Sequence, residues 1–298
     1  MVIGILVSRI REDEKLLFSE LQNRNIDFEK IDVRKINFDL SNGQKWRNYD
    51  LIVDRCISYS QSLAALQIIE SFGVPCINSS ESVLICGEKQ RTSLALFENN
   101  IPTPQVKIAF SMESALDAIE ELGYPVVLKP GVGSWGRLLA KINDREAAEA
   151  ILEHKTTLGS FHHSIFYIQE FIEKPGRDLR TYVLGNNTIC GISRNSSHWI
   201  TNTARGGIAE NLVITKEINE ISLKAAQAVG GEFVGVDLFE TLDGQLLVNE
   251  VNHSTEFKNS IKSTGVNIPG MLVDHIIQRL NNNSVGIDTV TSHYQYTE

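Results

Sequence analysis

Short apolar runs rich in β-branched residues alternate along the chain with longer segments in which apolar residues recur every three or four positions. The first pattern predicts buried strands, and the second predicts amphipathic helices. In the first part of the chain, residues 2–7 and 51–53 are predicted strands, and residues 12–25 and 60–72 are predicted helices. This alternation favours an α/β fold with parallel strands.

The same two patterns continue to residue 280, and strands become more frequent than helices after residue 165. The further predicted strands are 74–77, 105–110, 125–129, 138–142, 165–172, 179–184, 188–193, 233–239 and 246–251. The further predicted helices are 89–100, 112–122, 144–154, 218–229 and 269–280. Residues 281–298 are polar and unpatterned and are predicted to form a mobile tail.

Composition and charge restrict the class of protein. The 298 residues carry 28 Lys and Arg against 37 Asp and Glu, a net charge of −9, which argues against a general nucleic-acid or anionic-membrane binder. No uncharged run exceeds 14 residues, whereas a membrane-spanning helix needs about 18 apolar ones. Residues 1–7 are apolar without a basic region, which predicts a buried strand rather than a signal peptide. With four cysteines and no CxxC pair, we expect a cytoplasmic protein of about two domains.

A lysine and a glycine-rich loop form the first candidate site. Lys129 ends the strand 125–129, and glycines follow at positions 131, 133 and 136. Glycine lets backbone N–H groups approach an anion, and the lysine supplies the opposite charge, so the pattern suits a polyphosphate. The spacing differs from the Walker pattern. A glycine-rich hairpin turn is the alternative.

Acidic and amide side chains on two predicted strands form the second candidate site. Glu250 and Asn252 are two residues apart on one strand and therefore share a face, and a neighbouring strand can bring Asp237 beside them. Two carboxylates and an amide oxygen suit magnesium held together with substrate phosphates. Without the glycine loop, these would be polar residues at strand ends.

Several arginines lie in or near polar loops, where their forked guanidinium groups suit carboxylates and phosphates. They are Arg177, Arg180, Arg194 and Arg205. Each of them, taken alone, is better explained by a surface ion pair.

Taken in order, these features resemble the ATP-grasp superfamily over residues 1–281. The residues that carry the resemblance are Lys89, Lys129 with its glycine loop, the run Tyr167–Ile172, and Asp237 with Glu250 and Asn252. The resemblance implies an α/β protein with an ATP-grasp fold and an N-terminal doubly wound α/β (pre-ATP-grasp) domain. The implied domains are 1–88 (N-terminal), 89–164 (central subdomain with a glycine-rich lid), 165–281 (C-terminal subdomain with hinge and metal site) and 282–298 (polar tail).

Two runs, residues 168–180 and 202–207, are similar to the branch that contains RimK and the LysX and ArgX ligases. The run 248–259 resembles LysX-type ligases in particular. The resemblance implies an ATP-dependent ligase that joins α-aminoadipate to the C-terminal glutamate of an amino-group carrier protein through an acyl phosphate. The carrier is LysW-like: small, acidic and zinc-binding. A homodimer or homotetramer is also implied.

The resemblance further assigns roles to individual residues. Lys89 and Lys129 would bind the ATP phosphates. The phosphate lid would consist of Gly131, Gly133, Ser134, Trp135, Gly136 and Arg137. The hinge that contacts adenine would consist of Gln169, Glu170, Phe171 and Ile172. Asp178 would hold the ribose, and Arg194 and Asn202 would complete the nucleotide and acceptor site. Asp237, Glu250 and Asn252 would bind magnesium. Arg180 and Arg205 are the catalytic candidates that stabilise the acyl phosphate and the tetrahedral intermediate.

The amino-acid substrate remains open at this stage. In the family, Asn followed by Thr or Ala marks α-aminoadipate ligases and Gly-Phe marks glutamate ligases, whereas this chain has Asn259 and Ser260. One methylene distinguishes the two substrates and is worth only about 1–3 kcal/mol, so dual specificity is possible. The pair could instead only cap the loop before Gly265. The ATP-site residues also suit a RimK-type protein glutamate ligase or a nucleotide-binding regulatory protein without turnover.

Overall fold

The computed structural model describes residues 2–133, 138–158, 165–201 and 206–287. The contacts divide the chain into two compact units. The first unit comprises Met1–Ser80, Glu256–Ile261 and Gly265–Glu298, and the second comprises Glu81–Thr255 and Lys262–Thr264. None of the described helices has the length and apolar composition needed to cross a membrane.

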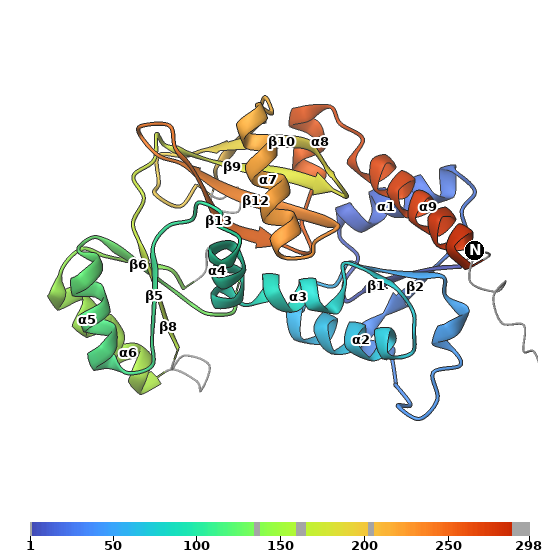
Figure 1. The fold of residues 1–298 in the computed structure, drawn as a ribbon, viewed down its shortest axis with the longest axis horizontal. Coiled ribbons are helices and arrows are strands. Elements are labelled where there is room, and N and C mark those ends of the chain that lie inside the picture. Colours follow the sequence, from blue (N-terminus) through green and yellow to red (C-terminus); the bar gives the residue numbers. More distant parts are fainter. Residues whose placement is uncertain (1, 134–137, 159–164, 202–205, 288–298) are drawn as a thin grey trace, which may run out of the picture. The chain divides into compact units, whose positions relative to one another are not determined.

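The first unit is built on a parallel four-stranded sheet with the order β2-β1-β3-β4 (Figure 1). Its strands are β1 (Ile3–Val7), β2 (Phe28–Asp32), β3 (Leu51–Asp54) and β4 (Cys76–Ile77). The helices are α1 (Glu12–Asn23), α2 (Tyr59–Ser71) and α9 (Ile268–Ile287), with 3₁₀ turns η1 (Val33–Lys35) and η2 (Trp46–Asn48). Every residue of β1 is buried, as expected for a strand in the middle of a covered parallel sheet. This is the doubly wound N-terminal arrangement that the sequence predicts.

The second unit contains two antiparallel sheets. The four-stranded one has the order β5-β8-β6-β7, with β5 (Val106–Ala109), β6 (Val126–Lys129), β7 (Ala140–Ile142) and β8 (Phe166–Glu170). Helices α5 (Met112–Leu122) and α6 (Arg145–Leu158) pack on it. The apolar side chains of Ile119, Leu152, Val126 and Ile168 form its core.

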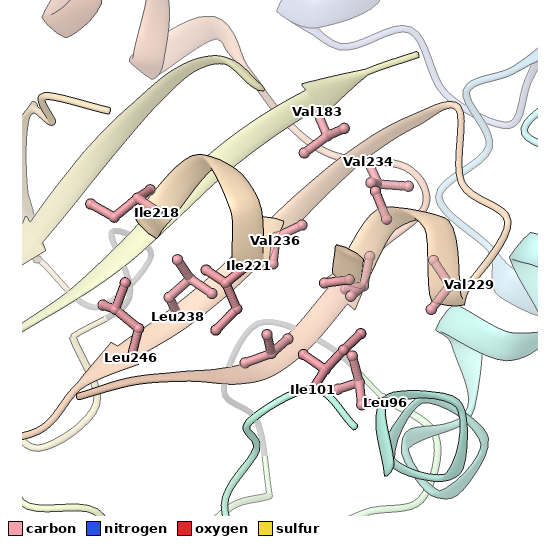
Figure 2. Packing of buried hydrophobic residues seen from close by; sticks show 14 of the residues in the cluster. Leu96, Ile101, Val183, Ile218, Ile221, Val229, Val234, Val236, Leu238 and Leu246 are labelled. Atoms are coloured by element: carbon pink, nitrogen blue, oxygen red, sulfur yellow. The ribbon is translucent and has the colours of Figure 1, made fainter. Parts of the chain in front are cut away.

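The five-stranded sheet has the order β11-β10-β9-β12-β13. Its strands are β9 (Arg177–Leu184), β10 (Asn187–Asn195), β11 (Ile208–Asn211), β12 (Phe233–Glu240) and β13 (Leu246–Asn252). Helices α7 (Lys216–Ala228) and α4 (Lys89–Glu98) share its core. Figure 2 shows Ile218 and Ile221 of α7 beside Val236 and Leu238 of β12. Two further helices are α3 (Ser80–Gly87) and α8 (Lys258–Thr264).

The expectation of parallel strands holds in the first unit and is wrong in the second. Only residues 185 and 186 separate β9 from β10, and five residues separate β12 from β13. Connections this short join antiparallel strands, whereas parallel neighbours need a crossover of about a dozen residues or more. The sequence pattern marks the strands themselves but not their relative direction.

The subdomain boundaries of the structure also differ from the predicted ones. Strand β8 lies in the predicted C-terminal segment 165–281, but it is hydrogen-bonded to β5 and β6 of the four-stranded sheet. Helix α9 packs on α1, where Arg24 donates to the Gly270 carbonyl at 3.2 Å. This helix continues to Ile287, so residues 281–287 of the predicted tail are helical. Residues 288–298 lie outside the described part of the chain.

Candidate functional site

A pocket in the second unit gathers many of the predicted site residues. It contains about 790 Å³ of empty space, part of it open to solvent. Its walls come from the ends of β6, β8 and β12, from β13, and from the segments that follow β8 and β10. The predicted residues that line it are Lys89, Lys129, Gly133, Gln169, Glu170, Phe171, Ile172, Asp178, Arg194 and Glu250. The size and the mixed polar and apolar lining are typical of a small-molecule site.

Two lysines meet at the start of the glycine-rich loop. Lys89 is the first residue of α4; its backbone N–H donates to the Gly131 carbonyl at 2.9 Å and its Nζ donates to the Gly133 carbonyl at 2.6 Å. Lys129 ends β6 and is only 5% exposed. Gly133 has φ +141, which favours glycine. The loop is thus anchored with both ammonium groups in the pocket wall.

The Lys129 ammonium group is buried and has an uncharged partner. Its Nζ donates to Asn249 Oδ1 at 2.8 Å. Burial lowers the pKa of Lys129 to about 7, although the nearby Glu250 carboxylate acts to raise it. A buried lysine in this state gains its full charge when an anion binds beside it.

Another part of the pocket lining is aromatic. Strand β8 ends at Glu170, whose side chain accepts from the Gln105 backbone N–H at 2.7 Å. The Phe171 ring lies edge-on to Trp199 at 6.1 Å and under Lys141 Nζ at 3.6 Å. Gln169 is 1% exposed, and within the described ranges its Nε2 has no hydrogen-bond partner. An aromatic wall with an unsatisfied donor suits a purine base.

A charged network also lines the pocket. Arg194 Nε donates to Asp178 Oδ1 at 2.5 Å, and the Thr201 hydroxyl donates to the other oxygen of the same carboxylate. Lys174 Nζ donates to Thr201 Oγ1 at 3.3 Å and lies 4.7 Å from the Phe239 ring centroid. Burial lowers the pKa of Lys174. Asp178, predicted to hold the ribose, already accepts on both oxygens and has only its remaining lone pairs for a ligand.

The predicted metal ligands lie together. Asp237 is directly opposite Glu250 in the β12–β13 ladder, and Asn252 Nδ2 lies 3.4 Å from Asp237 Oδ2 and 3.2 Å from Glu250 Oε1. In the part of the chain that the structure describes, no group of three or more His, Cys, Asp and Glu side chains could hold a metal. Two carboxylates and an amide oxygen nevertheless fit magnesium that shares its coordination with substrate phosphates.

Asp237 is paired with two arginines. Arg180 binds it bidentately, with Nε–Oδ1 at 2.6 Å and Nη2–Oδ2 at 2.7 Å, and Arg194 Nη2 lies 3.2 Å from Oδ1. Burial alone would raise the pKa of Asp237, but the two guanidinium groups hold it well below its usual range. Arg180, the predicted catalytic residue, therefore forms an ion pair with Asp237, a predicted metal ligand.

A β-bulge explains one residue that the sequence prediction missed. The ladder pairs Asp237 with Glu250 and then Leu238 with Val248, so Asn249 is the additional residue of β13. Strict alternation puts Asn249 on the face opposite Glu250, whereas the bulge redirects it and both side chains line the pocket. Other pocket residues missed by the prediction include Lys174, Trp199, Thr201 and Phe239, and these four carry no local pattern that marks them.

The remaining predicted residues fall elsewhere. Ser134, Trp135, Gly136, Arg137, Asn202 and Arg205 lie outside the described residues. Asn259 is exposed and Ser260 is buried on α8, and both belong to the first compact unit. The pair lies inside a helix that ends at Gly265 with φ +71, so Gly265 rather than the pair provides the cap.

Comparison with known proteins agrees with this architecture. Residues 3–85 match the LysX preATP-grasp domain, and residues 86–276 match the RimK-like ATP-grasp domain. The chain is 39% identical over 226 residues to the α-aminoadipate–LysW ligase LysX of Saccharolobus solfataricus, covering 76% of this chain and 82% of that protein. It is 33% identical over 280 residues to the glutamate–LysW ligase ArgX of Sulfolobus acidocaldarius, covering 93% and 98%.

Solved structures show the same fold. A RimK domain ATP-grasp protein from Sphaerobacter thermophilus superposes with a TM-score of 0.77 at 24% identity, covering 92% of this chain and 99% of that one. The fold and the pocket define an ATP-grasp protein. More narrowly, the chain belongs to the RimK-like ATP-grasp family of ATP-dependent ligases and carries a LysX-type preATP-grasp domain.

Proposed function

We propose that this chain joins the α-amino group of α-aminoadipate to the side-chain carboxylate of the C-terminal glutamate of a LysW-like carrier protein. The observation that carries the proposal is a pocket lined by Lys89, Lys129 and Glu250 in a chain that is 39% identical to a LysX ligase. The run 248–259, which resembles LysX-type ligases, supports the same substrate. The carrier is expected to be small, acidic and zinc-binding.

The reaction has two balanced steps. A carboxylate oxygen of the carrier attacks the γ-phosphorus of ATP, and ADP leaves as the acyl phosphate forms. The amine nitrogen of the second substrate then attacks the acyl carbon, and phosphate leaves as the amide forms and the nitrogen loses its proton. Both steps gather negative charge on phosphoryl oxygens, which cations in the pocket stabilise.

The residues of the chain have distinct parts in this scheme. Lys89 and Lys129 bind the ATP phosphates, and the wall around Phe171 takes the base. Asp237, Glu250 and Asn252 would hold magnesium, which when bound supplies positive charge at the transferred phosphoryl group. Arg180 and Arg205 stabilise the acyl phosphate and the tetrahedral intermediate.

Glutamate is the second candidate substrate. The ArgX relative covers 93% of this chain at 33% identity, and Ser260 departs from the Thr or Ala that follows Asn in α-aminoadipate ligases. A pocket that accepts α-aminoadipate discriminates only weakly against glutamate, because glutamate is shorter by one methylene group. A third candidate function is the addition of glutamate to a protein tail at the same ATP site, as RimK-type enzymes do.

We also propose a cytoplasmic homodimer or homotetramer. The four cysteines are free thiols, and three of them, Cys56, Cys76 and Cys190, are buried, an arrangement that suits a reducing compartment. Symmetric oligomers are the general expectation for soluble enzymes.

ADP release from the purified protein tests the proposal. The assay contains Mg-ATP, the carrier protein and one of α-aminoadipate, glutamate or aspartate, and the control is a carrier shortened by its C-terminal glutamate. We expect ADP release that needs both the intact carrier and an amino acid and is fastest with α-aminoadipate. Equal ADP release with the shortened carrier would disprove the proposal, and faster release with glutamate would favour the second candidate.

A further inference from the structure

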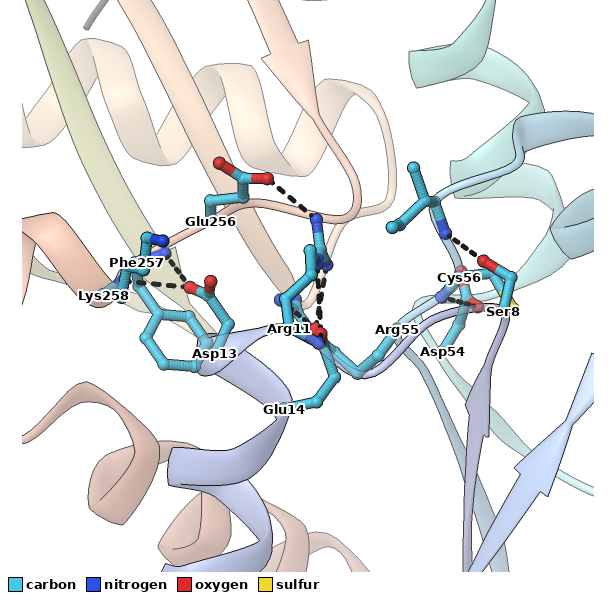
Figure 3. A network of polar contacts seen from close by, with 11 residues as sticks. Ser8, Arg11, Asp13, Glu14, Asp54, Arg55, Cys56, Glu256, Phe257 and Lys258 are labelled. Atoms are coloured by element: carbon cyan, nitrogen blue, oxygen red, sulfur yellow. Dashed lines mark hydrogen bonds and ion pairs between the residues drawn. The ribbon is translucent and has the colours of Figure 1, made fainter. Parts of the chain in front are cut away.

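Helix α8 begins without a capping side chain of its own, because its N-cap residue is Phe257. The first N–H groups of a helix have no acceptor within it and need one from elsewhere. Asp13 Oδ1 accepts from the backbone N–H groups of Phe257 at 2.5 Å and of Lys258 at 2.9 Å. Asp13 lies in the first turn of α1, so a distant helix supplies the cap of α8 (Figure 3).

Side chains around this cap hold the neighbouring residues of the same segment. Arg11 Nη1 donates to Glu256 Oε1 at 3.0 Å, and Glu14 fixes Arg11 by accepting from its Nε at 3.0 Å and its Nη2 at 2.8 Å. Arg55 is 1% exposed, donates to Glu14 at 3.2 Å and has its guanidinium carbon 5.4 Å from the Phe257 ring centroid. The backbone at the start of α8 is therefore held by Asp13 of α1. The side chains of Glu256 and Phe257 are contacted by Arg11 and Arg55, which lie next to α1 and β3 (Figure 3).

The Asp13 carboxylate that caps α8 is buried, and only one of its two oxygens has a hydrogen-bond partner among the described residues. Asp13 is 1% exposed, and its Oδ2 is buried with no hydrogen-bond partner among the residues that the structure describes. A buried carboxylate oxygen without a partner costs free energy. The two hydrogen bonds to Oδ1 fix the positions of the Phe257 and Lys258 peptides at the start of α8.

We propose that Asp13 is a positioning residue for amino-acid selection, acting through the start of α8 on Asn259 and Ser260. The inference rests on the proposed function and on the expectation, implied by the resemblance, that this pair distinguishes α-aminoadipate from glutamate. The backbone connects the two parts directly, because Ser260 N–H donates to the Phe257 carbonyl at 2.9 Å. A shift of the Phe257 peptide therefore moves the pair that follows it.

Three variants test the inference in the full-length protein. Asp13→Ala removes both hydrogen bonds, Asp13→Asn keeps an acceptor of the same shape, and Asp39→Ala is the matched control. Asp39 is an exposed aspartate that accepts from a backbone N–H, that of Ser41 at 2.9 Å. The measurements are KM and kcat for α-aminoadipate and for glutamate, KM for ATP, and hydrogen exchange of residues 257–264.

We expect Asp13→Ala to raise the KM for α-aminoadipate about tenfold and to bring its preference over glutamate towards unity, as loss of charge-assisted hydrogen bonds does. KM for ATP should stay at its wild-type value. Hydrogen exchange across α8 should become faster. Asp13→Asn should restore most of the preference, and Asp39→Ala should change none of these quantities.

Two results would overturn the inference. One is an unchanged preference in Asp13→Ala together with faster exchange in α8, which would make the cap purely structural. The other is a parallel rise of KM for ATP and for both amino acids, which would indicate general loss of structure. If Asp13→Ala does not fold, Asp13→Leu, which removes the same acceptor and leaves less empty space, is compared in the same way. Failure of the proposed function is distinguishable, because the wild-type protein would then lack carrier-dependent turnover while the exchange measurement still reports on the cap.

Discussion

Lys129 Nζ donates a hydrogen bond to Asn249 Oδ1 at 2.8 Å, across the pocket wall between β6 and the bulge of β13. The partner of this buried ammonium group is a neutral amide. Burial therefore dominates and lowers the pKa of Lys129 to about 7. The lysine that the proposal assigns to the ATP phosphates is consequently half neutral in the free protein near pH 7.

The first prediction is that ATP binding at pH 8 is accompanied by proton uptake. Free Lys129 with a pKa of about 7 is mostly neutral at pH 8, and phosphate oxygens beside it favour the charged form. We expect uptake approaching about one proton per ATP, and an affinity that falls by up to about tenfold per pH unit above pH 7. Calorimetry in two buffers of different ionisation enthalpy measures the uptake.

Lys129→Met is the control for this linkage. The variant should lose the uptake and bind ATP more weakly by about 1–3 kcal/mol, the range for a charge-assisted hydrogen bond. Between pH 7 and 10.5 the unfolded chain carries a proton at this lysine that the folded chain lacks, so its contribution to stability increases with pH in that window. Equal proton uptake in the wild type and the variant would contradict the assignment.

The second prediction concerns Asn249→Asp. A carboxylate in place of the amide raises the pKa of Lys129, because an opposite charge now lies within hydrogen-bonding distance. We expect the proton uptake at pH 8 to disappear and ATP affinity to fall, since the new charge repels the phosphates. The control is Asn187→Asp, which adds the same charge at an exposed position on β10. If the control lowers affinity as much, the effect is one of net charge.

The third prediction is that Glu250→Gln removes magnesium-dependent turnover without loss of structure. The substitution deletes one charge from the proposed metal site and keeps the shape of a partly buried side chain. Turnover at saturating magnesium should fall by about 10²–10³-fold, as when one electrostatic contact to developing charge is removed. The melting temperature should match that of Glu220→Gln on the exposed side of α7. Wild-type turnover in Glu250→Gln would contradict the metal assignment.

The fourth prediction is a change of substrate preference when Asn259 and Ser260 are replaced by Gly and Phe. We expect a shift towards glutamate of about 10- to 200-fold in the ratio of kcat/KM values, the range that one methylene permits. Because Ser260 is 1% exposed, the phenylalanine should also cost about 1–3 kcal/mol in stability through overpacking. Ser260→Ala, which restores a dipeptide found in α-aminoadipate ligases, should keep the preference. Equal losses for both amino acids would mean that the pair is structural.

The sequence predicts much of this molecule because many of its signals are local. The alternation of apolar runs marks most strands. Ser111, a residue type favoured at helix N-caps, directly precedes α5, and its side chain accepts from Ser114 N–H. Asp237 lies beside Glu250 and Asn252, as strand periodicity predicts once β12 is paired with β13.

The features that escaped prediction depend on non-local geometry. Asn249 enters the pocket only because the ladder has a bulge, which the residue pattern does not mark. Helix α8 is short, and its cap, Asp13, is 244 residues from Phe257, so no local signal marks its start. Strand β8 continues a series of predicted strands, and only its hydrogen bonds to β5 and β6 assign it to the four-stranded sheet.

The intact mass of the carrier protein tests the central claim most directly. The carrier is incubated with the enzyme, Mg-ATP and equal concentrations of α-aminoadipate and glutamate, and its mass is then measured. The account predicts that the carrier gains the mass of one α-aminoadipate residue, only when ATP is present and only when its C-terminal glutamate is intact. An unmodified carrier, or the same adduct on a carrier without that glutamate, would contradict it.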